Sequence, residues 1–367
     1  MHGCWWVVSA VSKTETDHEI LKPQDFCVTL HFRYYLMKVF KINDINELPV
    51  GGSNPSEVHP EEEGLSAAAG TAVTVGMFDG VHLGHRHILS TLAEVAQRYA
   101  LRPVVVTFDN HPRQVLSDGS ASFSRITTNE ERCRLLEESG VREVAVLHFT
   151  PQLAQLSACE FLQQVLVGQL HARALVLGFD NMFGNKGRND FDRLRLLADT
   201  LGVQVVDDTA VCCQGDEVSS TRIRRLLRDG DVAQAALLLG APYRVSGSVV
   251  QGRQVGRHIG FPTANVQPSS ALKVLPGDGV YAVRAWLADE AEPRMAMANV
   301  GGQPTFGCDR PAIEVHLLDY HGDLYGQPVT VEFVDRLRDI RRFASAEALA
   351  AQLACDREAV RAAMEKK

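Results

Sequence analysis

The sequence Val75-Gly76-Met77-Phe78-Asp79-Gly80-Val81-His82-Leu83-Gly84-His85 decides the fold of the first half of the chain. Before it, residues 71–74 alternate in polarity and are rich in β-branched side chains, which is typical of a buried strand. After it, residues 86–99 carry apolar side chains at helical spacing. A strand, a turn containing glycines and a helix start together predict an anion site, because free N–H groups and the positive end of the helix dipole face the turn. Gly76 and Gly84 allow a ligand to approach the backbone closely.

Two histidines, His82 and His85, stand three residues apart at the start of this predicted helix. Their imidazole rings could donate hydrogen bonds to phosphate oxygens. The pair alone leaves two alternatives open, which are a metal site and an ordinary turn with two surface histidines.

Predicted strands and helices alternate after residue 71. The strands cover residues 71–74, 103–108, 141–149, 174–178 and 203–206, and the helices cover residues 86–99, 128–139, 157–166 and 191–201. This alternation predicts an α/β fold with a doubly wound, Rossmann-like parallel sheet, in which ligands bind at the carboxyl ends of the strands. The polar stretches 76–85, 107–112 and 178–187 all follow predicted strands, so we expect them at the same edge.

The pattern changes near residue 240. Short alternating segments with Gly and Pro turns cover residues 244–250, 280–287, 296–300, 312–318 and 328–334, and residues 345–364 follow with helical spacing. This pattern predicts a small antiparallel β-barrel with a C-terminal helix. We therefore expect three parts. Residues 1–70 form a partly disordered extension and linker with a possible true start near Met37, and two domains cover residues 71–240 and 241–367.

Composition limits the class of protein. The chain has 367 residues, 45% of them hydrophobic and 22% charged, with a net charge of −8, which argues against a nucleic-acid-binding protein. The eight cysteines are scattered without a C-x-x-C pair, as expected for reduced thiols. The sequence has no apolar run of membrane-spanning length and no clear signal peptide, so we expect a cytoplasmic protein without a membrane partner.

A second anion site is predicted at residues 219–224, whose sequence is Ser-Ser-Thr-Arg-Ile-Arg. Ser219, Ser220 and Thr221 precede or begin an amphipathic helix, where hydroxyls and free N–H groups, with Arg222 nearby, could hold a polyphosphate. The alternative is an ordinary capped helix with solvated arginines.

These stretches together carry a family resemblance. G-x-F-D-G-V-H-x-G-H at residues 76–85, S-S-T-R-I-R, residues 107–112 and residues 178–184 resemble signatures of the adenylyltransferase module of prokaryotic bifunctional riboflavin kinase/FAD synthetases. The resemblance implies that the FMN phosphate attacks the α-phosphorus of ATP in this half, giving FAD and pyrophosphate.

The second half contains a glycine-dense segment, residues 247–265, which lacks the Gly-Lys-Ser/Thr of a Walker loop. If residues 263–265 are extended, Thr263 and Asn265 share a face and offer two neutral oxygens that suit a hydrated Mg²⁺. Glu314 aligns with His316 on a predicted strand and is a candidate general base, or else an exposed cross-strand charge. Residues 252–265, 299–307, 314–316 and 324–326 resemble riboflavin kinase, which implies phosphorylation of riboflavin by ATP to give FMN.

The resemblance assigns roles to individual residues. The catalytic residues expected are Glu314, His82, His85 and Arg222. The nucleotide-binding residues expected are Gly76, Phe78, Asp79, Gly84, Asp180, Ser219, Ser220, Thr221, Gly252, Gly256, Arg257 and Gly260. Asn299 and Arg338 are expected to bind flavin, and Thr263 and Asn265 to hold Mg²⁺. ATP is the co-substrate, FMN and FAD are product ligands, and we expect a monomer or weak homo-oligomer.

Three positions depart from the family pattern. Glu217 stands where a basic residue is common, Asn181 stands where a Phe is usual, and Ile340 stands where a Glu is common. If one activity is weakened, the first two predict that it is adenylylation. The alternatives are an enzyme with riboflavin kinase activity alone and, in another class, a flavin-binding protein without turnover.

Overall fold

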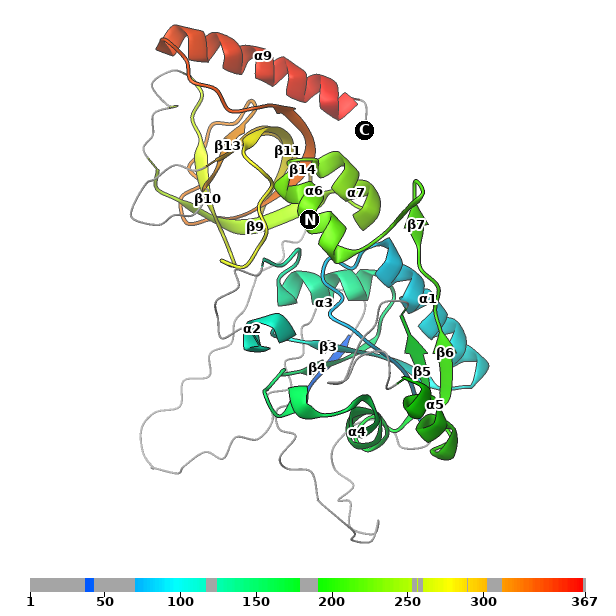
Figure 1. Cartoon of the computed structure of the whole chain (residues 1–367). Helices are drawn as coiled ribbons and strands as arrows, with labels where there is room; N and C mark the ends of the chain where they lie inside the picture. The colour runs from blue at the N-terminus through cyan, green and yellow to red at the C-terminus, as the bar shows by residue number, and fades with distance from the viewer. Residues whose placement is uncertain are drawn as a thin grey trace, which may run out of the picture.

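The computed structural model describes residues 37–42, 70–116, 124–178, 191–252, 256, 260–288, 290–301 and 312–365. These residues form a parallel sheet flanked by helices, a closed barrel and a C-terminal helix (Figure 1). The predicted fold class is confirmed. The expectations for Asp180, Asn181 and Arg257 lie outside the described residues.

The sheet has six strands in the order β1-β4-β3-β2-β5-β6, and every neighbouring pair is parallel. The strands are β1 (Lys38–Ile42), β2 (Thr71–Val75), β3 (Arg102–Phe108), β4 (Glu143–Leu147), β5 (Ala172–Leu177) and β6 (Gln204–Asp207). The chain moves outward from β2 in one direction to β4, and then in the other direction to β5 and β6. The end of β2 is therefore the switch point at which such sheets bind ligands. β1 lies within the expected extension and linker, residues 1–70, yet it forms an edge strand of this sheet.

Helices cover both faces of the sheet. On one face, α1 (Leu83–Arg98) and α3 (Asn129–Glu138) bury their apolar stripes against the strands. On the other lie α4 (Ala158–Phe161), the π-helical turn η2 (Leu162–Val167) and α5 (Phe191–Thr200). Both α3 and α4 begin at capping boxes, Thr128 with Glu131 and Ser157 with Glu160, which satisfy backbone N–H groups that the helices leave free. The predicted helix starts are confirmed there.

The barrel closes in the order β10-β13-β12-β11-β14-β9, with all pairs antiparallel. Its strands are β9 (Tyr243–Val250), β10 (Ala264–Pro268), β11 (Gly279–Leu287), β12 (Arg294–Gly301), β13 (Ala312–Leu317) and β14 (Pro328–Arg338). On β13, Ile313 and Val315 are buried in the barrel interior, so Glu314 between them faces outward. Helix α9 (Ala346–Glu365) packs on β11, β12 and β14.

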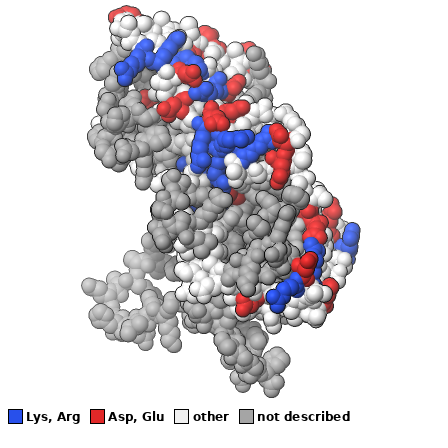
Figure 2. Space-filling view, in the orientation of Figure 1, with Lys and Arg blue, Asp and Glu red and all other residues white. Residues whose placement is uncertain are grey.

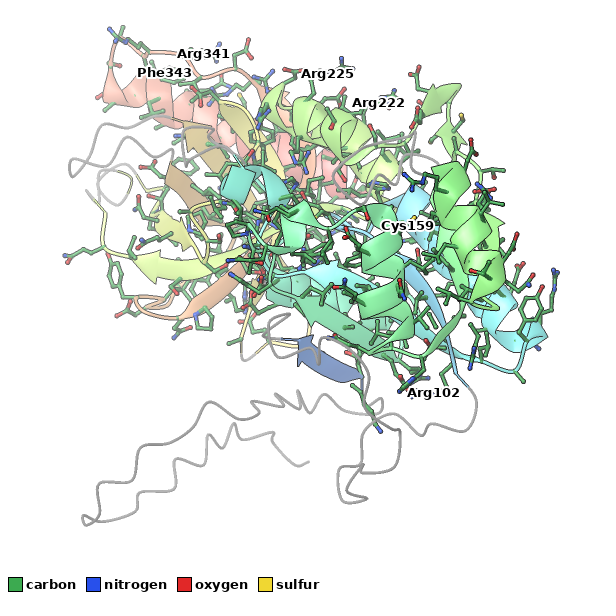
Figure 3. The ribbon with its side chains drawn as sticks, turned by 60° about the horizontal axis from the view of Figure 1, so that its bottom comes forward. Arg102, Cys159, Arg222, Arg225, Arg341 and Phe343 are labelled. Carbon is green, nitrogen blue, oxygen red and sulfur yellow. The ribbon has the colours of Figure 1, made fainter. Side chains whose placement is uncertain are left out.

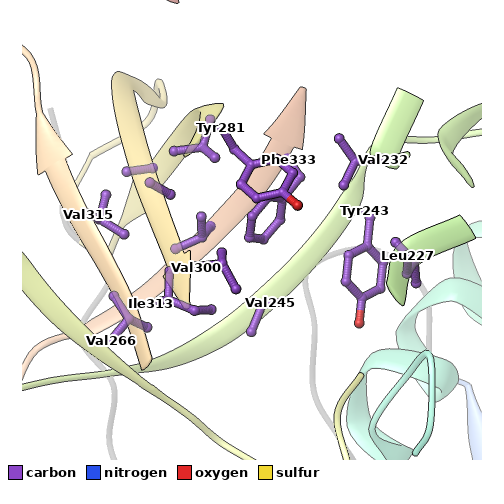
Figure 4. Close-up of a cluster of buried hydrophobic side chains, with 14 of the residues drawn as sticks. Leu227, Val232, Tyr243, Val245, Val266, Tyr281, Val300, Ile313, Val315 and Phe333 are labelled. Carbon is purple, nitrogen blue, oxygen red and sulfur yellow. The ribbon is translucent and has the colours of Figure 1, made fainter. Parts of the chain in front are cut away.

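Two helices join the halves. They are α6 (Ser220–Arg228) and α7 (Val232–Leu239), and both precede the boundary expected at residue 240. Their side chains nevertheless belong to the barrel core, in which Leu227 and Val232 pack with Tyr243 and Phe333 (Figure 4). Because the same cluster includes Ile126 from the first half, one continuous apolar core spans the junction.

Candidate functional site

A cavity of about 300 Å³ lies at the carboxyl end of β2, between the first turns of α1 and α6. Its lining includes Gly76, Gly84, His85, Ser220 and Thr221, so the two anion sites predicted from separate stretches of sequence meet in one place. Both helices direct free N–H groups and positive dipole ends toward the cavity. The site therefore suits an elongated polyanion that contacts both helix starts.

The two histidines of the signature lie together in this cavity. His82 is the N-cap of α1, and its Nδ1 accepts the backbone N–H of His85 at 3.3 Å. The two rings stack with centroids 3.6 Å apart. Burial, partly offset by Asp79, lowers the pKa of His82 to about 4, and burial and the neighbouring His82 hold the pKa of His85 well below its ordinary value. Both rings are therefore neutral at pH 7, and a neutral imidazole still has one N–H to donate.

The metal-site alternative for this pair has no support in the geometry. His82 uses Nδ1 as a helix cap. Among the described residues, no group of three His, Cys, Asp or Glu side chains is arranged to hold a metal ion.

The side chain of Asp79 holds the loop at residues 76–85 in place. Its buried carboxylate accepts hydrogen bonds from the N–H groups of Ile126 and Thr127 at 3.1 and 2.9 Å and pairs with Arg224 at 2.8 Å. Burial alone would raise the pKa of Asp79, but Arg224 and the two N–H groups hold it below the ordinary value. Ser220 of α6 also donates to the Asp79 carbonyl at 3.0 Å. Asp79 therefore connects the first signature, at residues 76–85, to the second, at residues 219–224.

The loop that Asp79 holds has unusual backbone geometry. Phe78 and Val81 have φ values of +49° and +40°, a region that side chains other than glycine rarely adopt, and both residues are buried. Such conformations cost about 1–3 kcal/mol each and persist only where the surroundings enforce them. Here Asp79 and the packed Phe78 ring supply that enforcement.

The two arginines of the second signature have different positions. Arg224 lines the cavity, whereas Arg222, which the resemblance selected as catalytic, pairs with the exposed Asp216 at 2.6 Å and is not among the lining residues. Figure 2 shows Lys and Arg side chains gathered over α6, and Figure 3 locates Arg222 and Arg225 on this helix. Glu217 does line the cavity, so the acidic departure from the family pattern faces the expected triphosphate.

The stretch at residues 107–112, which also resembles a family signature, contributes to the site. His111 lines the cavity, although our sequence-based site list omits it. The buried Arg132 of α3 donates to the carbonyls of Met77 and Phe108 at 3.2 and 2.6 Å. These hydrogen bonds fix the ends of β2 and β3. A basic side chain in the middle of a capped helix gives no sequence signal for this role.

The barrel brings a second group of predicted residues together. In the strand register, Glu314 of β13 stands directly opposite Asn265 of β10 on one side and Asn299 of β12 on the other. Directly opposed residues share a face, so a carboxylate and two amides form one row on the outer surface of the barrel. Arg338 lies further along the same row, since Val280 of β11 stands opposite both Asn299 and Arg338, but Asp356 of α9 holds its guanidinium through three hydrogen bonds.

Glycine lets a loop approach this row. A Cβ on Gly252 would lie 2.0 Å from Nδ2 of Asn265, and a Cβ on Gly256 would lie 2.2 Å from the Phe261 carbonyl oxygen. Gly260 has φ +80°. Thr263 borders a neighbouring cavity of about 80 Å³ next to Tyr325.

Comparison with known families matches each half separately. Residues 65–222 match the family model described as FAD synthetase, and residues 239–364 match that described as riboflavin kinase. The chain belongs to the bifunctional riboflavin kinase/FMN adenylyltransferase family. We call the sheet with its cavity, through residue 222, the adenylyltransferase half, and the barrel with α9 the kinase half. Residues 223–238, between the two matches, contain most of the two junction helices.

Relatives in this family align over most of their length. The chain is 37% identical over 293 residues to the bifunctional riboflavin kinase/FMN adenylyltransferase of Haemophilus influenzae, covering 80% of this chain and 94% of that one. It is 38% identical over 287 residues to that of Escherichia coli K12, covering 78% and 90%.

A solved structure shares the arrangement. The crystal structure described as a macrolide-efflux protein from Streptococcus pneumoniae superposes with a TM-score of 0.73 at 33% identity, over 88% of this chain and 98% of that one. In the described part of the present chain, no helix has the length and apolar character needed to cross a membrane.

Proposed function

We propose that this member of the family converts riboflavin to FAD in two ATP-dependent steps, with FMN made on the barrel and adenylylated in the cavity beside β2. The observation that carries the proposal is the meeting of the two anion sites in one cavity, while Glu314, Asn265 and Asn299 form a separate row on the barrel.

In the adenylyltransferase half, the cavity would hold the triphosphate of ATP. The first turns of α1 and α6 offer N–H groups, the neutral histidines offer ring N–H groups, and Arg224 contributes a cation. The FMN phosphate oxygen bonds to the α-phosphorus while the bond from that phosphorus to the bridging oxygen of pyrophosphate breaks. A phosphate monoester is already an anion at pH 7, so this half needs no general base. It needs alignment and stabilisation of the charge that develops on the leaving pyrophosphate.

In the kinase half, the ribityl 5′-hydroxyl of riboflavin attacks the γ-phosphorus of ATP and must lose its proton. Glu314 is the candidate base, since it is the carboxylate of the row and is only partly buried. Asn265 and Asn299 on either side would orient the phosphate and the flavin. The proton moves to the Glu314 carboxylate as the new O–P bond forms and the bond from the γ-phosphorus to the bridging oxygen breaks, so that ADP leaves.

Magnesium fits the same edge of the barrel. Mg²⁺ commonly takes one or two protein oxygens and completes its shell with water and substrate phosphates, which matches the neutral oxygens of Thr263 and Asn265. The close approach of Gly252 to Asn265 leaves backbone rather than a side chain over that amide. When bound, the ion would neutralise charge on the transferring phosphate.

The test separates the two activities in one purified protein. Riboflavin and Mg-ATP are supplied, and FMN and FAD are quantified by chromatography. We expect both products in the wild type, FMN-to-FAD conversion without FMN synthesis in Glu314→Ala, and FMN without FAD in His85→Ala. Accumulation of FMN alone by the wild type would support the single-activity alternative, and flavin binding without ATP consumption would support the non-catalytic one.

The cellular setting follows from the same proposal. Free cysteines such as Cys133 and Cys159 suit a reducing cytoplasm, where riboflavin and ATP are available. We propose a monomer or weak homo-oligomer that binds small molecules and neither nucleic acid nor membrane.

A further inference from the structure

A lysine of the kinase half is buried in the adenylyltransferase half. Lys273, in the segment after β10, is 7% exposed, and its Nζ pairs with Glu131 of α3 at 2.5 Å. The same Nζ donates to the carbonyl of Ile126 at 2.7 Å and lies 4.8 Å from the centre of the Tyr243 ring. The backbones of the two halves are also hydrogen-bonded here. The N–H of Arg125 donates to the Leu272 carbonyl, and the Arg125 carbonyl accepts the N–H of Val274.

The peptide that Lys273 holds is the one that supports the signature loop. The Ile126 carbonyl accepts from Lys273, and the N–H of the same peptide group, that of Thr127, donates to the Asp79 carboxylate at 2.9 Å, as does the Ile126 N–H. Thr127 adds a second link, since its hydroxyl donates to Asp79 at 3.0 Å and accepts the Gly80 N–H at 3.0 Å. A continuous series of hydrogen bonds therefore runs from the barrel through Ile126 and Thr127 to the loop that carries His82.

An ion pair between domains ordinarily adds only affinity between them. This one differs because the loop that it supports is strained at Phe78 and Val81 and depends on Asp79 to stay in place. A shift of about 1 Å in such a loop would misalign the groups around a phosphate, and misplacement of that size can cost about a hundredfold in rate.

We propose that Lys273, a residue of the kinase half, is a positioning residue for FMN adenylylation in the other half. It touches no substrate and acts by holding the Ile126 peptide against Asp79. The inference rests on the proposed function of the cavity beside β2. The wild-type protein is therefore assayed first, because failure of FMN adenylylation there would overturn the proposed function rather than this step.

The experiment measures both half-reactions in the full-length Lys273→Met variant. We expect kcat for FMN adenylylation to fall at least tenfold, KM for FMN to change less than threefold, and the riboflavin kinase rate to stay within twofold. Arg284→Met is the matched control, because it removes a barrel cation from a buried partner, Glu332, without contact to Ile126. We expect no selective loss there. Equal losses in both half-reactions of Lys273→Met, or unchanged adenylylation, would overturn the proposal.

Two further variants test whether Lys273 positions the Ile126 peptide or only neutralises the buried carboxylate of Glu131. Glu131→Gln keeps the capping box and the Lys273 hydrogen bond to Ile126, so we expect adenylylation within threefold of wild type. Lys273→Met/Glu131→Gln removes both charges and so leaves no buried carboxylate without a cation, and it is the deciding variant if Lys273→Met does not fold. Its adenylylation is expected to remain at least tenfold low. Recovery to the wild-type rate would mean that Lys273 only neutralises Glu131.

Discussion

His82 and His85 stack face to face, with ring centroids 3.6 Å apart and ring planes 15° apart, at the first turn of α1. Two stacked imidazoles cannot both carry charge at low cost, and burial already disfavours the protonated forms. A triphosphate between the helix starts would reverse this balance, because it favours protonated rings. The pair is therefore neutral without nucleotide and gains proton affinity when a polyanion arrives.

This relationship predicts how stability depends on pH. The pKa of His82 is about 4 in the folded protein against 6.5 in an unfolded chain, so the folded state binds fewer protons between those values. The contribution of His82 to the free energy of unfolding is complete above pH 6.5. It is lost as the pH falls toward 4, a decrease of about 3 kcal/mol. His82→Asn retains a good N-cap and removes this titration. Urea unfolding between pH 4.5 and 7.5 should give a shallower pH dependence for the variant, and parallel curves would contradict the assignment.

Glu217 predicts a variant with improved activity. This exposed carboxylate borders the cavity that would hold the triphosphate, so it should oppose nucleotide binding. Glu217→Lys should lower KM for ATP in adenylylation by roughly fivefold at low salt, about 1 kcal/mol, with a smaller effect at high salt. Steady-state kinetics at two ionic strengths measure this effect. Asp216→Lys makes the same charge change one residue away and outside the lining, and an equal gain there would mean that net charge alone is responsible.

The two arginines of the second signature, Arg222 and Arg224, predict a contrast that reverses the sequence-based assignment. Arg222 pairs with an exposed carboxylate, so Arg222→Met should change the adenylylation rate less than threefold. Arg224 lines the cavity and neutralises Asp79, so Arg224→Met should lower that rate about a hundredfold or more. Thermal melting identifies any part of the Arg224 effect that comes from the buried carboxylate left without a cation. The reverse order of effects would restore Arg222 as the catalytic arginine.

Gly252 predicts a selective loss in the kinase half. A Cβ there would lie 2.0 Å from the Asn265 amide, so Gly252→Ala must displace Asn265 from its place beside Glu314. Riboflavin phosphorylation should fall at least tenfold while FMN adenylylation is unchanged. Gly202→Ala is the control, because a Cβ meets open space there and the positive φ alone costs about 1 kcal/mol. An unchanged kinase rate in Gly252→Ala would remove Asn265 from the mechanism.

The local parts of this fold could be predicted from sequence. Alternation and capping residues gave the order of strands and helices, because they report short-range backbone preferences. Thr128 and Ser157, for example, begin the helices where predicted. The sequence indicates the strand β10 only as a possibility, since its five residues carry little alternation of polar and apolar side chains.

Contacts between distant segments could not be predicted. Nothing in the residues around Lys273 indicates that its side chain ends at Glu131, 142 positions earlier. Likewise, helical spacing shows that Arg222 and Arg224 point in different directions, but not which of them faces the cavity. Those outcomes depend on how the halves pack, which a single sequence does not encode in any short pattern.

The helix α6 has a consequence for how this protein could be divided. Ser220 and Arg224 serve the adenylylation cavity, while Ile223 and Leu227 fill the barrel core. A cut before this helix would remove the cavity's second signature, and a cut after it would expose apolar surface on the barrel. The two halves therefore share a structural part, and we expect either half produced alone to need a replacement for what the other supplies.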